Sequence, residues 1–444
     1  MELMEQEWVP QLDQLMESVQ MLQALRDPTR SDHSRAVASL DEHVTHPSFV
    51  VVMMHVFSCG AKYQQQGLST DLRQLAGLVI KNYVFPHLVR LSADVQTMLK
   101  KEVIRVMQDE NTDVRRTAAI LAGKISESFP VSTWGDMMPP ILQMLDISLY
   151  NTQPHVLNGA LQATLRICED SGIKLALDDV RRPLDELVPR LLALTTCSDP
   201  DIRIGALSSY NSLLYLLGST YPSGGSDAQR SRNSSFHDSD DNSSNTERAR
   251  SPISPHGNLT LGNAVHPLMM HMNAFIAQLS TLSADTHSKI RTAVCQAITI
   301  ISTTHVAALE PYFPAICNFM LLALQDTEEC VAIESCEFWA VMVESADTKR
   351  AISPYLCTLI EHLIKRLYLT SDQMEQERIE EEEENSGEKE LNLRPMHHRA
   401  QGGHNGSAID NDAEDKENAE LSAKWTLRKQ AALLLDTVAV SFPP

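Results

Sequence analysis

The sequence predicts an all-α solenoid, in which antiparallel helix pairs stack in a row around one continuous core. An amphipathic helix is expected at residues 111–125, where apolar residues follow the spacing of one helix face: Val114, Ala118, Leu121 and Ile125. The acid–aliphatic–arginine triplet that begins this helix recurs along the chain. Its aliphatic residue lies at positions 72, 114 and 202, with weaker copies at 156, 290, 331 and 427. A lone helix of this length is marginal in water, so repeated neighbours must cover its apolar stripe.

The spacing of the triplets identifies the repeat unit. Successive aliphatic positions lie 42 residues apart from 72 to 114 and from 114 to 156, 46 apart from 156 to 202, and 41 apart from 290 to 331. A period of about 40 to 47 residues is typical of a two-helix HEAT-type unit. The long steps, 88 residues from 202 to 290 and 96 from 331 to 427, each accommodate one further unit plus an insertion. We expect an α-solenoid of about eight HEAT-type antiparallel helix pairs that form a right-handed superhelical arch.

Composition narrows the possible functions. The 444 residues carry a formal net charge of −21, which argues against nonspecific binding to nucleic acid or an anionic membrane and favours basic protein partners. The eight cysteines contain no C-x-x-C pair and mostly lie in apolar helical stretches, as expected for core residues in a reducing compartment. There is no signal peptide and no uninterrupted apolar span of about 20 residues. We expect a soluble, intracellular monomer.

The helix pairs can be placed along the chain from their apolar patterns. Repeats 1–5 are expected over residues 1–221, repeats 6–8 over 264–372 with only the first helix of repeat 8, and the second helix of repeat 8 over 423–444. In three pairs the first helix carries an internal proline after an apolar residue. Because an internal proline removes a helix hydrogen bond, these prolines predict bends in one helical layer: Pro139, Pro189 and Pro314.

The first insertion covers residues 222–263. It is rich in Ser, Asn, Asp, Gly and Arg and has few apolar residues, so it is expected to be disordered. Ser251 and Ser254 each precede a proline and are possible phosphorylation sites. The alternative is an unregulated linker.

The second insertion, residues 373–422, is an acidic segment expected to be a disordered loop between the two helices of repeat 8. A block of like charges repels itself and stays extended. Two interpretations remain open: the loop keeps the protein soluble, or it competes with a basic ligand because it is tethered close to the solenoid surface. The acidic residues selected as this loop's functional candidates are Glu380, Glu381, Glu382, Glu383, Glu384, Asp410, Asp412, Glu414 and Asp415.

No enzyme motif is found. The chain lacks a phosphate-binding glycine loop, G-x-S-x-G, H-E-x-x-H and paired-cysteine metal motifs, so no catalytic residue, cofactor or metal is predicted. His397, His398 and His404 lie in the acidic segment, which offers no fixed ligand geometry. The arginine triplets allow an anion-binding ladder, but we favour a structural role, with each arginine bridging to an acid of a neighbouring repeat.

Several motifs resemble transportins, the karyopherin-β2 branch of the importin-β nuclear transport receptors. The acidic insertion lies in the eighth pair, as in that family. The similar motifs cover most of the chain from residue 70: Leu75–Asn82, Tyr150–Thr152, Gly159–Gln162, Ile167–Ser171, Arg182–Leu184, Cys336–Trp339, Leu393-Arg394-Pro395-x-His397-x-Arg399 and Trp425-x-Leu427-Arg428-Lys429.

The resemblance implies a receptor that shuttles between cytoplasm and nucleus. It implies that the N-terminal repeats bind the GTP form of Ran, that the acidic loop couples Ran binding to cargo release, and that cargo carries a basic, proline-tyrosine nuclear localisation signal. Nucleoporins are further implied partners. Carried over by motif position, the Ran-facing candidates are Lys81, Asn82, Glu169, Asp170 and Glu337.

The resemblance also implies that the chain corresponds to the N-terminal portion of a longer repeat array, whose cargo site lies largely outside it. The alternative from another functional class is a HEAT-repeat scaffold subunit of a phosphatase or other multiprotein complex.

Overall fold

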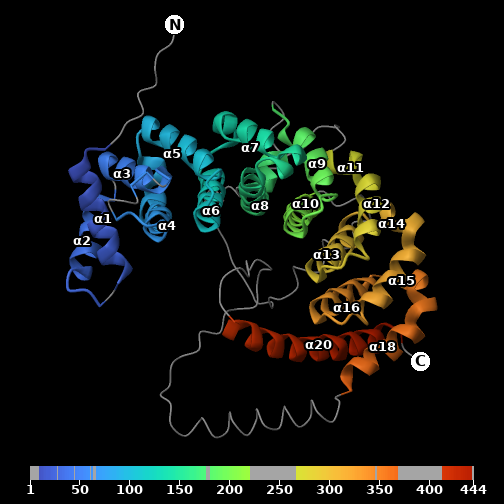
Figure 1. Cartoon of the computed structure of the whole chain (residues 1–444). Helices are drawn as coiled ribbons and strands as arrows, with labels where there is room; N and C mark the ends of the chain where they lie inside the picture. Colours follow the sequence, from blue (N-terminus) through green and yellow to red (C-terminus); the bar gives the residue numbers. More distant parts are fainter. Residues whose placement is uncertain are drawn as a thin grey trace, which may run out of the picture. The chain divides into compact units, whose positions relative to one another are not determined.

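The computed structural model describes residues 10–27, 29–44, 46–60, 62–63, 67–176, 181–220, 267–345, 348–368 and 413–442 (Figure 1). Within these ranges every regular element is helical. The chain divides into two compact units, Met1–Thr281 and Leu282–Pro444. The all-α, helical-repeat prediction is therefore confirmed.

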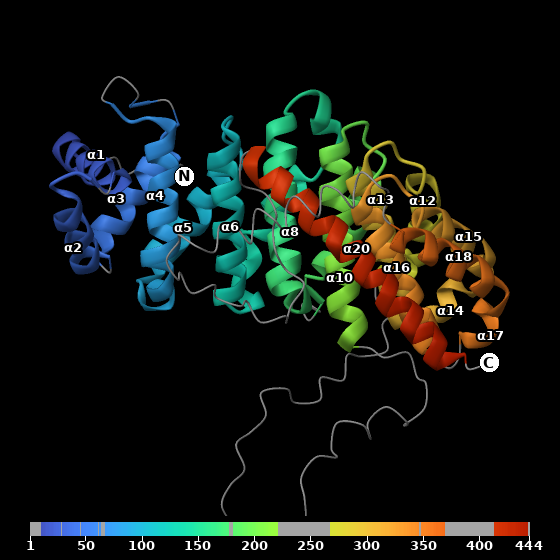
Figure 2. The same ribbon diagram turned by 90° about the horizontal axis from the view of Figure 1, so that it is seen from below.

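Unit 1 contains the first series of antiparallel pairs. In chain order its helices are α1 (Leu12–Arg26), α2 (His33–His43), α3 (Pro47–Ser58), α4 (Thr70–Val79), η2 (Ile80–Val84), η3 (Phe85–Arg90), α5 (Ala93–Val106), α6 (Thr112–Ser128), η4 (Val131–Asp136), α7 (Met138–Met144), η5 (Ile147–Asn151), α8 (Pro154–Ala176), α9 (Pro183–Leu194), α10 (Pro200–Thr220), α11 (Pro267–Met270) and α12 (Met272–Leu282). Consecutive second helices pack on each other, α4 on α6, α6 on α8 and α8 on α10. They run side by side as one layer (Figure 2).

Unit 2 repeats this arrangement. Its helices are α13 (Ser288–Thr304), α14 (Val306–Leu309), η6 (Glu310–Tyr312), α15 (Phe313–Ala323), α16 (Glu329–Glu344), α17 (Lys349–Ile352), η7 (Ser353–Tyr355), α18 (Leu356–Leu367) and α20 (Ala413–Ser441). Helix α16 packs between α13 and α20, while α15 and α18 form the second layer.

Helix α6 shows why the repeat folds as it does. The Asn111 side-chain oxygen accepts hydrogen bonds from the amides of Asp113 and Val114, at 3.0 and 3.1 Å, and so caps the helix. Such a cap contributes about 1 kcal/mol. The four apolar positions expected on one face are at most 1% exposed and pack within the core. The apolar stripe was predicted from the sequence, and the structure adds the cap.

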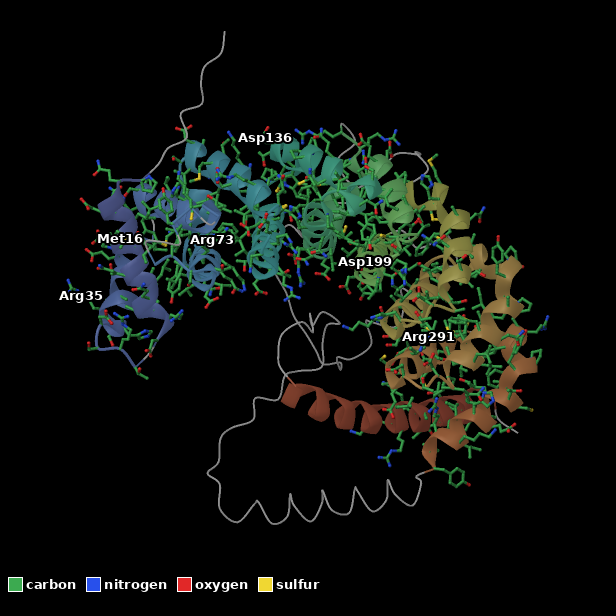
Figure 3. The ribbon with its side chains drawn as sticks, in the orientation of Figure 1. Met16, Arg35, Arg73, Asp136, Asp199 and Arg291 are labelled. Carbon is green, nitrogen blue, oxygen red and sulfur yellow. The ribbon has the colours of Figure 1, made fainter. Side chains whose placement is uncertain are left out.

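The triplet arginines are structural, but they use two kinds of partner. Arg73, which is labelled in Figure 3, forms a salt bridge with Asp109 of the next repeat and donates to the Phe57 carbonyl. Arg115 and Arg203 donate to carbonyls in the loop of their own pair, at 2.7 to 2.9 Å. The expected bridge to an acid of a neighbouring repeat is therefore formed by Arg73, and loop carbonyls are a further kind of partner for these arginines.

The expectation of an internal proline is met in one helix and wrong for two. Pro189 lies inside α9. Pro139 and Pro314 occupy the first positions of α7 and α15, after short 3₁₀ turns. The first amides of a helix have no intrahelical partner, so proline there costs no hydrogen bond and produces no bend.

Helix α20 begins at Ala413, ten residues before the predicted start at 423. The sequence Ala413-Glu414-Asp415-Lys416-Glu417 places good helix formers and acids in the first turns, which favour helix at an N-terminus. Its buried positions, Leu427, Ala431, Leu434 and Val438, form the face that packs in unit 2.

One described stretch, Val306–Ala323, is apolar and long enough to cross a membrane by length and composition. It is divided into α14, η6 and α15, and its buried residues include Leu309, Cys317 and Met320. Helix α15 packs on α16 and α18. We therefore interpret the stretch as part of the core of unit 2.

Candidate functional site

The predicted partner-facing residues Lys81 and Asn82 lie in η2, a five-residue π-helix that continues α4. Asn82 is exposed and Lys81 is half-buried. A π-helical turn widens the helix and frequently occurs at functional sites. Their backbone is held by the buried neighbours Ile80 and Val84, so both polar side chains are carried on a fixed turn.

Glu169 and Asp170 belong to a charged cluster built from α6 and α8. Arg166 donates to the Glu169 carboxylate at 2.9 Å, and Lys124 donates to Glu127 at 2.6 Å. Asp170 lies against α6: a Cβ atom at Gly123 would be 2.7 Å from its Oδ2. We call these five charged residues (Lys124, Glu127, Arg166, Glu169 and Asp170) the α6–α8 cluster.

The two carboxyls at the centre of this cluster share a common electrostatic setting. Burial raises the pKa of Glu169, and the charge and hydrogen bond of Arg166 oppose this rise. Burial also raises the pKa of Asp170, while the charge of Lys124 acts in the opposite direction. Asp170 is exposed as a residue, but its carboxylate lies against α6 and is partly desolvated there, and it has no hydrogen bond or salt bridge among the described residues. It is the acid of the cluster that is open to an external donor.

A bend in α8 follows these acids directly. Ser171 has non-helical backbone angles (φ −143°, ψ 18°) and is buried. Its hydroxyl pairs with that of Ser126 in α6 at 3.1 Å. One turn later, the Lys174 ammonium donates to the carbonyls of Ser126, Glu127 and Phe129, at 2.9, 2.6 and 3.3 Å. The last turn of α8 is thus fastened to the C-terminal end of α6, which fixes the backbone that carries Asp170.

Glu337 lies in α16 of unit 2 and is half-buried between the buried residues Cys336, Phe338 and Trp339. It belongs to unit 2, whereas the α6–α8 cluster belongs to unit 1.

Sequence reasoning missed three members of the cluster: Lys124, Glu127 and Arg166. Their signal was present as the pairs Lys124/Glu127 and Arg166/Glu169, each three residues apart on a helix. What the spacing did not indicate is that the two pairs belong to adjacent helices.

Several predicted residues lie outside the described part of the chain. These are Ser251, Ser254, Glu380, Glu381, Glu382, Glu383, Glu384, Asp410 and Asp412. Glu414 and Asp415 lie in the first turn of α20, and nothing is described of their side chains. In the described ranges, no group of three or more His, Cys, Asp or Glu residues is arranged to hold a metal ion.

No protein-family model matches the chain. The chain is 27% identical to Transportin-1 of Mus musculus over 398 residues, which is 89% of this chain and 38% of the mouse protein. It is 25% identical to Transportin of Dictyostelium discoideum over 369 residues, covering 83% of this chain and 34% of that protein. The chain therefore spans less than half the length of these curated relatives.

Solved structures share the fold. A crystal structure of Kap121p bound to RanGTP matches 97% of this chain and 33% of Kap121p, with a TM-score of 0.57 and 13% identity. The Kap95:Nup1 complex matches 81% of this chain and 39% of that chain, with a TM-score of 0.55 and 13% identity. At such identity the likeness concerns the fold alone, and it agrees with the predicted stack of helix pairs.

Proposed function

Because the chain is a transportin-like member of the importin-β family, we propose that it forms part of a nuclear import receptor that binds the GTP form of Ran. The observation that carries this proposal is the similarity to Transportin-1 along 89% of the chain. A protein of the same fold, Kap121p, has been solved bound to RanGTP. The function is binding and transport rather than catalysis.

Two parts of unit 1 supply the proposed Ran-facing residues. Lys81 and Asn82 present polar groups on η2, and Glu169 and Asp170 present carboxylates on α8. An acidic surface is complementary to a basic partner surface and accelerates its encounter. Glu337 of unit 2 is the further candidate.

In this proposal the acidic segment controls the release of cargo. In this proposal Glu380–Glu384 and Asp410–Asp415 compete with basic cargo, which carries a proline-tyrosine localisation signal, when Ran binds. Nucleoporins are proposed as partners during passage through the nuclear pore, in line with the Kap95:Nup1 complex of the same fold. Such a receptor would move between cytoplasm and nucleus.

The first experiment compares binding of the full chain to Ran locked on GTP and on GDP. We expect clear retention of the GTP form and at least tenfold weaker retention of the GDP form. Asp170→Asn and Glu169→Gln should weaken the GTP complex, whereas Asp94→Asn, an exposed acid in the first turn of α5, should not. Equal or absent binding of both forms would contradict the receptor function and favour the scaffold alternative.

The second experiment tests the acidic segment. Residues 375–420 are deleted from a full-length receptor of this type, and release of a bound cargo peptide by Ran-GTP is followed by fluorescence anisotropy. We expect slower or incomplete release. Unchanged release would exclude the coupling role, without affecting the Ran-binding proposal.

A further inference from the structure

A groove in the first helix pair has no part in the proposed function. It has a volume of about 460 Å³ and lies between α1, α2 and the start of α3. Its lining positions on α1 run from Gln14 to Ala24, and at 1.5 Å per helical residue they span about 15 Å. A volume of this size falls within the range of about 300 to 1,000 Å³ that ligand-binding clefts occupy.

The floor of the groove is apolar and incompletely covered. Val52 of α3 is buried, whereas Met21 of α1 and Phe49 of α3 are only half-buried. Two of the side chains beside them are small, Ser18 of α1 and Ser39 of α2, which leaves room for an inserted side chain. Removing the remaining apolar surface of Met21 and Phe49 from water is favourable, so the floor fits an apolar side chain.

The α2 edge of the groove offers a cation. Arg35, which is labelled in Figure 3, is exposed and has no hydrogen bond or salt bridge among the described residues. Asp32 on the same edge is already held by Arg30 through two hydrogen bonds of 2.9 Å. Glu17 is exposed on the opposite, α1 edge. A segment that brings a carboxylate to the α2 edge therefore finds a partner there.

Arg35 marks the far end of the groove. His33 Nδ1 lies 3.0 Å from the Ala24 carbonyl oxygen, so the start of α2 lies beside the end of α1. Arg35 follows two residues later in α2. The other end of the groove, at Gln14, lies one turn into α1, next to the point where the chain enters this helix.

The chain enters α1 on the side of the groove. Gln11, the residue before α1, has extended backbone angles (φ −61°, ψ 145°), so the chain turns away from the helix axis there. Gln11, Gln14 and Ser18 follow the i, i+3, i+7 spacing of one helix face, and the last two line the groove. Residues 1–9 can extend over about 30 Å, twice the length of the groove.

The composition of residues 1–9 matches the groove. This segment lies outside the described part of the chain and contains no lysine or arginine. Its apolar residues are Met1, Leu3, Met4, Trp8 and Val9, and its charged residues are Glu2, Glu5 and Glu7. Trp8 is three residues from Gln11, within about 10 Å, whereas Glu5 and Glu2 can reach about 20 to 30 Å, as far as the end marked by Arg35.

We propose that residues 1–9 fold back along α1 and occupy this groove, with apolar side chains against Phe49 and Met21 and a glutamate paired with Arg35. The occupant is a segment of the same chain. The proposal goes beyond the proposed function, because no residue of the groove is a Ran-facing candidate.

Fluorine NMR of the full chain tests the proposal. The four tryptophans are replaced by 5-fluorotryptophan, and the Trp8 signal is assigned with Trp8→Phe. A soluble gadolinium chelate broadens the signals of exposed side chains. We expect the Trp8 signal to broaden at least threefold less than it does in a free peptide of residues 1–11. Equal broadening in the chain and in the peptide overturns the proposal.

Filling the groove tests the location. Ser18→Leu places a larger side chain in the groove and should raise the broadening of Trp8 to the value of the free peptide. Thr97→Leu introduces the same side chain at an exposed position of α5 and should leave the broadening unchanged. If Trp8 stays protected in Ser18→Leu, it is covered elsewhere and the assignment to this groove is wrong.

Charge reversal tests the ion pair. Arg35→Glu should raise the broadening of Trp8 at least twofold, and adding Glu2→Arg and Glu5→Arg to that variant should restore protection. Arg90→Glu, at an exposed arginine of η3, is the matched control and should have no effect. Failure of the two glutamate reversals to restore protection would show that Arg35 does not hold the segment.

Dilution identifies whose groove is occupied. Broadening of the Trp8 signal that is unchanged on tenfold dilution supports binding within one chain. Broadening that rises towards the peptide value shows that residues 1–9 occupy the groove of a second copy, which overturns the assignment to the same chain. None of these measurements uses Ran, so their outcome is independent of the receptor function.

Discussion

Arg291 of α13 donates hydrogen bonds from Nε and Nη2 to the two carboxylate oxygens of Asp326, each 2.8 Å long. Arg291 Nη1 also donates to the Asp285 carbonyl at 2.9 Å. Asp326 lies in the loop between α15 and α16, and its Oδ1 accepts from the Glu328 amide at 2.9 Å. One arginine therefore joins the loops of two successive repeats. Both side chains are less than one-fifth exposed, so this pair is shielded from solvent.

Asp326→Asn should destabilise unit 2. The change removes a bidentate charge-assisted pair and leaves the Arg291 charge largely buried, so the free energy of unfolding should fall by about 2 to 3 kcal/mol. Urea unfolding followed by circular dichroism measures this. Glu361→Gln is the control, because its salt bridge with Lys365 is more than 60% exposed on both sides and should contribute less than about 0.5 kcal/mol. Equal effects of the two substitutions would contradict the role of the pair.

The pair of Arg291 and Asp326 also predicts that the free energy of unfolding depends on pH. Burial acts to raise the pKa of Asp326, but hydrogen bonds from Arg291 and the Glu328 amide outweigh it and hold the pKa below the ordinary value. The stabilisation is therefore present above the unfolded pKa of about 3.9 and is lost as the pH falls through the folded value. Between about pH 5 and pH 3, the wild-type chain should lose more unfolding free energy than Asp326→Asn. Equal losses of unfolding free energy in the wild-type chain and in Asp326→Asn would show that protonation of Asp326 does not cause the pH dependence.

For Asp170 the expected effect of pH on the free energy of unfolding has the opposite sign. Burial raises its pKa, so the folded state disfavours the ionised form. Asp170→Asn should leave stability at pH 7 unchanged or slightly higher, and any gain should vanish as the pH falls below the unfolded pKa. Thermal unfolding across pH measures this. A destabilised Asp170→Asn variant would indicate a structural rather than a binding role for this carboxylate.

Gly159 should not tolerate a side chain. A Cβ atom there would lie 1.9 Å from the Met107 carbonyl oxygen, so the backbone between α5 and α6 would have to move. Gly159→Ala should cost about 2 to 3 kcal/mol of unfolding free energy. Gly205→Ala is the matched control, because its Cβ would meet the Leu161 side chain at 2.8 Å, which can move, and alanine favours the helix by about 1 kcal/mol. If both variants unfold at the same urea concentration, the close approach at Gly159 is unimportant.

Lys174 should control the opening of the last turn of α6. Lys174→Met removes an ammonium that donates to three carbonyls, so hydrogen exchange of the amides at residues 126–129 should become about tenfold faster. Mass spectrometry of peptides from this region measures the exchange. Lys365→Met on exposed α18 should leave exchange in α6 unchanged.

The repeat period and most helix bounds were predictable from local pattern. The helix predicted at residues 111–125 matches α6 (Thr112–Ser128) closely, because a capping asparagine and a 3.6-residue apolar period act within one helix. The prolines at 139 and 314 were misread because the period shows where a helix lies better than where it begins. The early start of α20 has a similar cause, since acidic residues favour both an extended segment and a helix N-terminus.

The amino-acid sequence by itself determined the class of fold and the repeat length, because both depend on residues close together in the chain. Asp170 became a candidate through the resemblance to transportins. Only the tertiary structure decided that Asp170 lies against Gly123 and has no salt bridge among the described residues, that Lys174 fastens α8 to α6, and that Gly172 approaches Leu213 and Leu216 of α10. These relationships join residues on different helices, about one repeat apart. They depend on how closely neighbouring helices approach, which glycines at 123, 159 and 172 permit and which no single-helix pattern encodes.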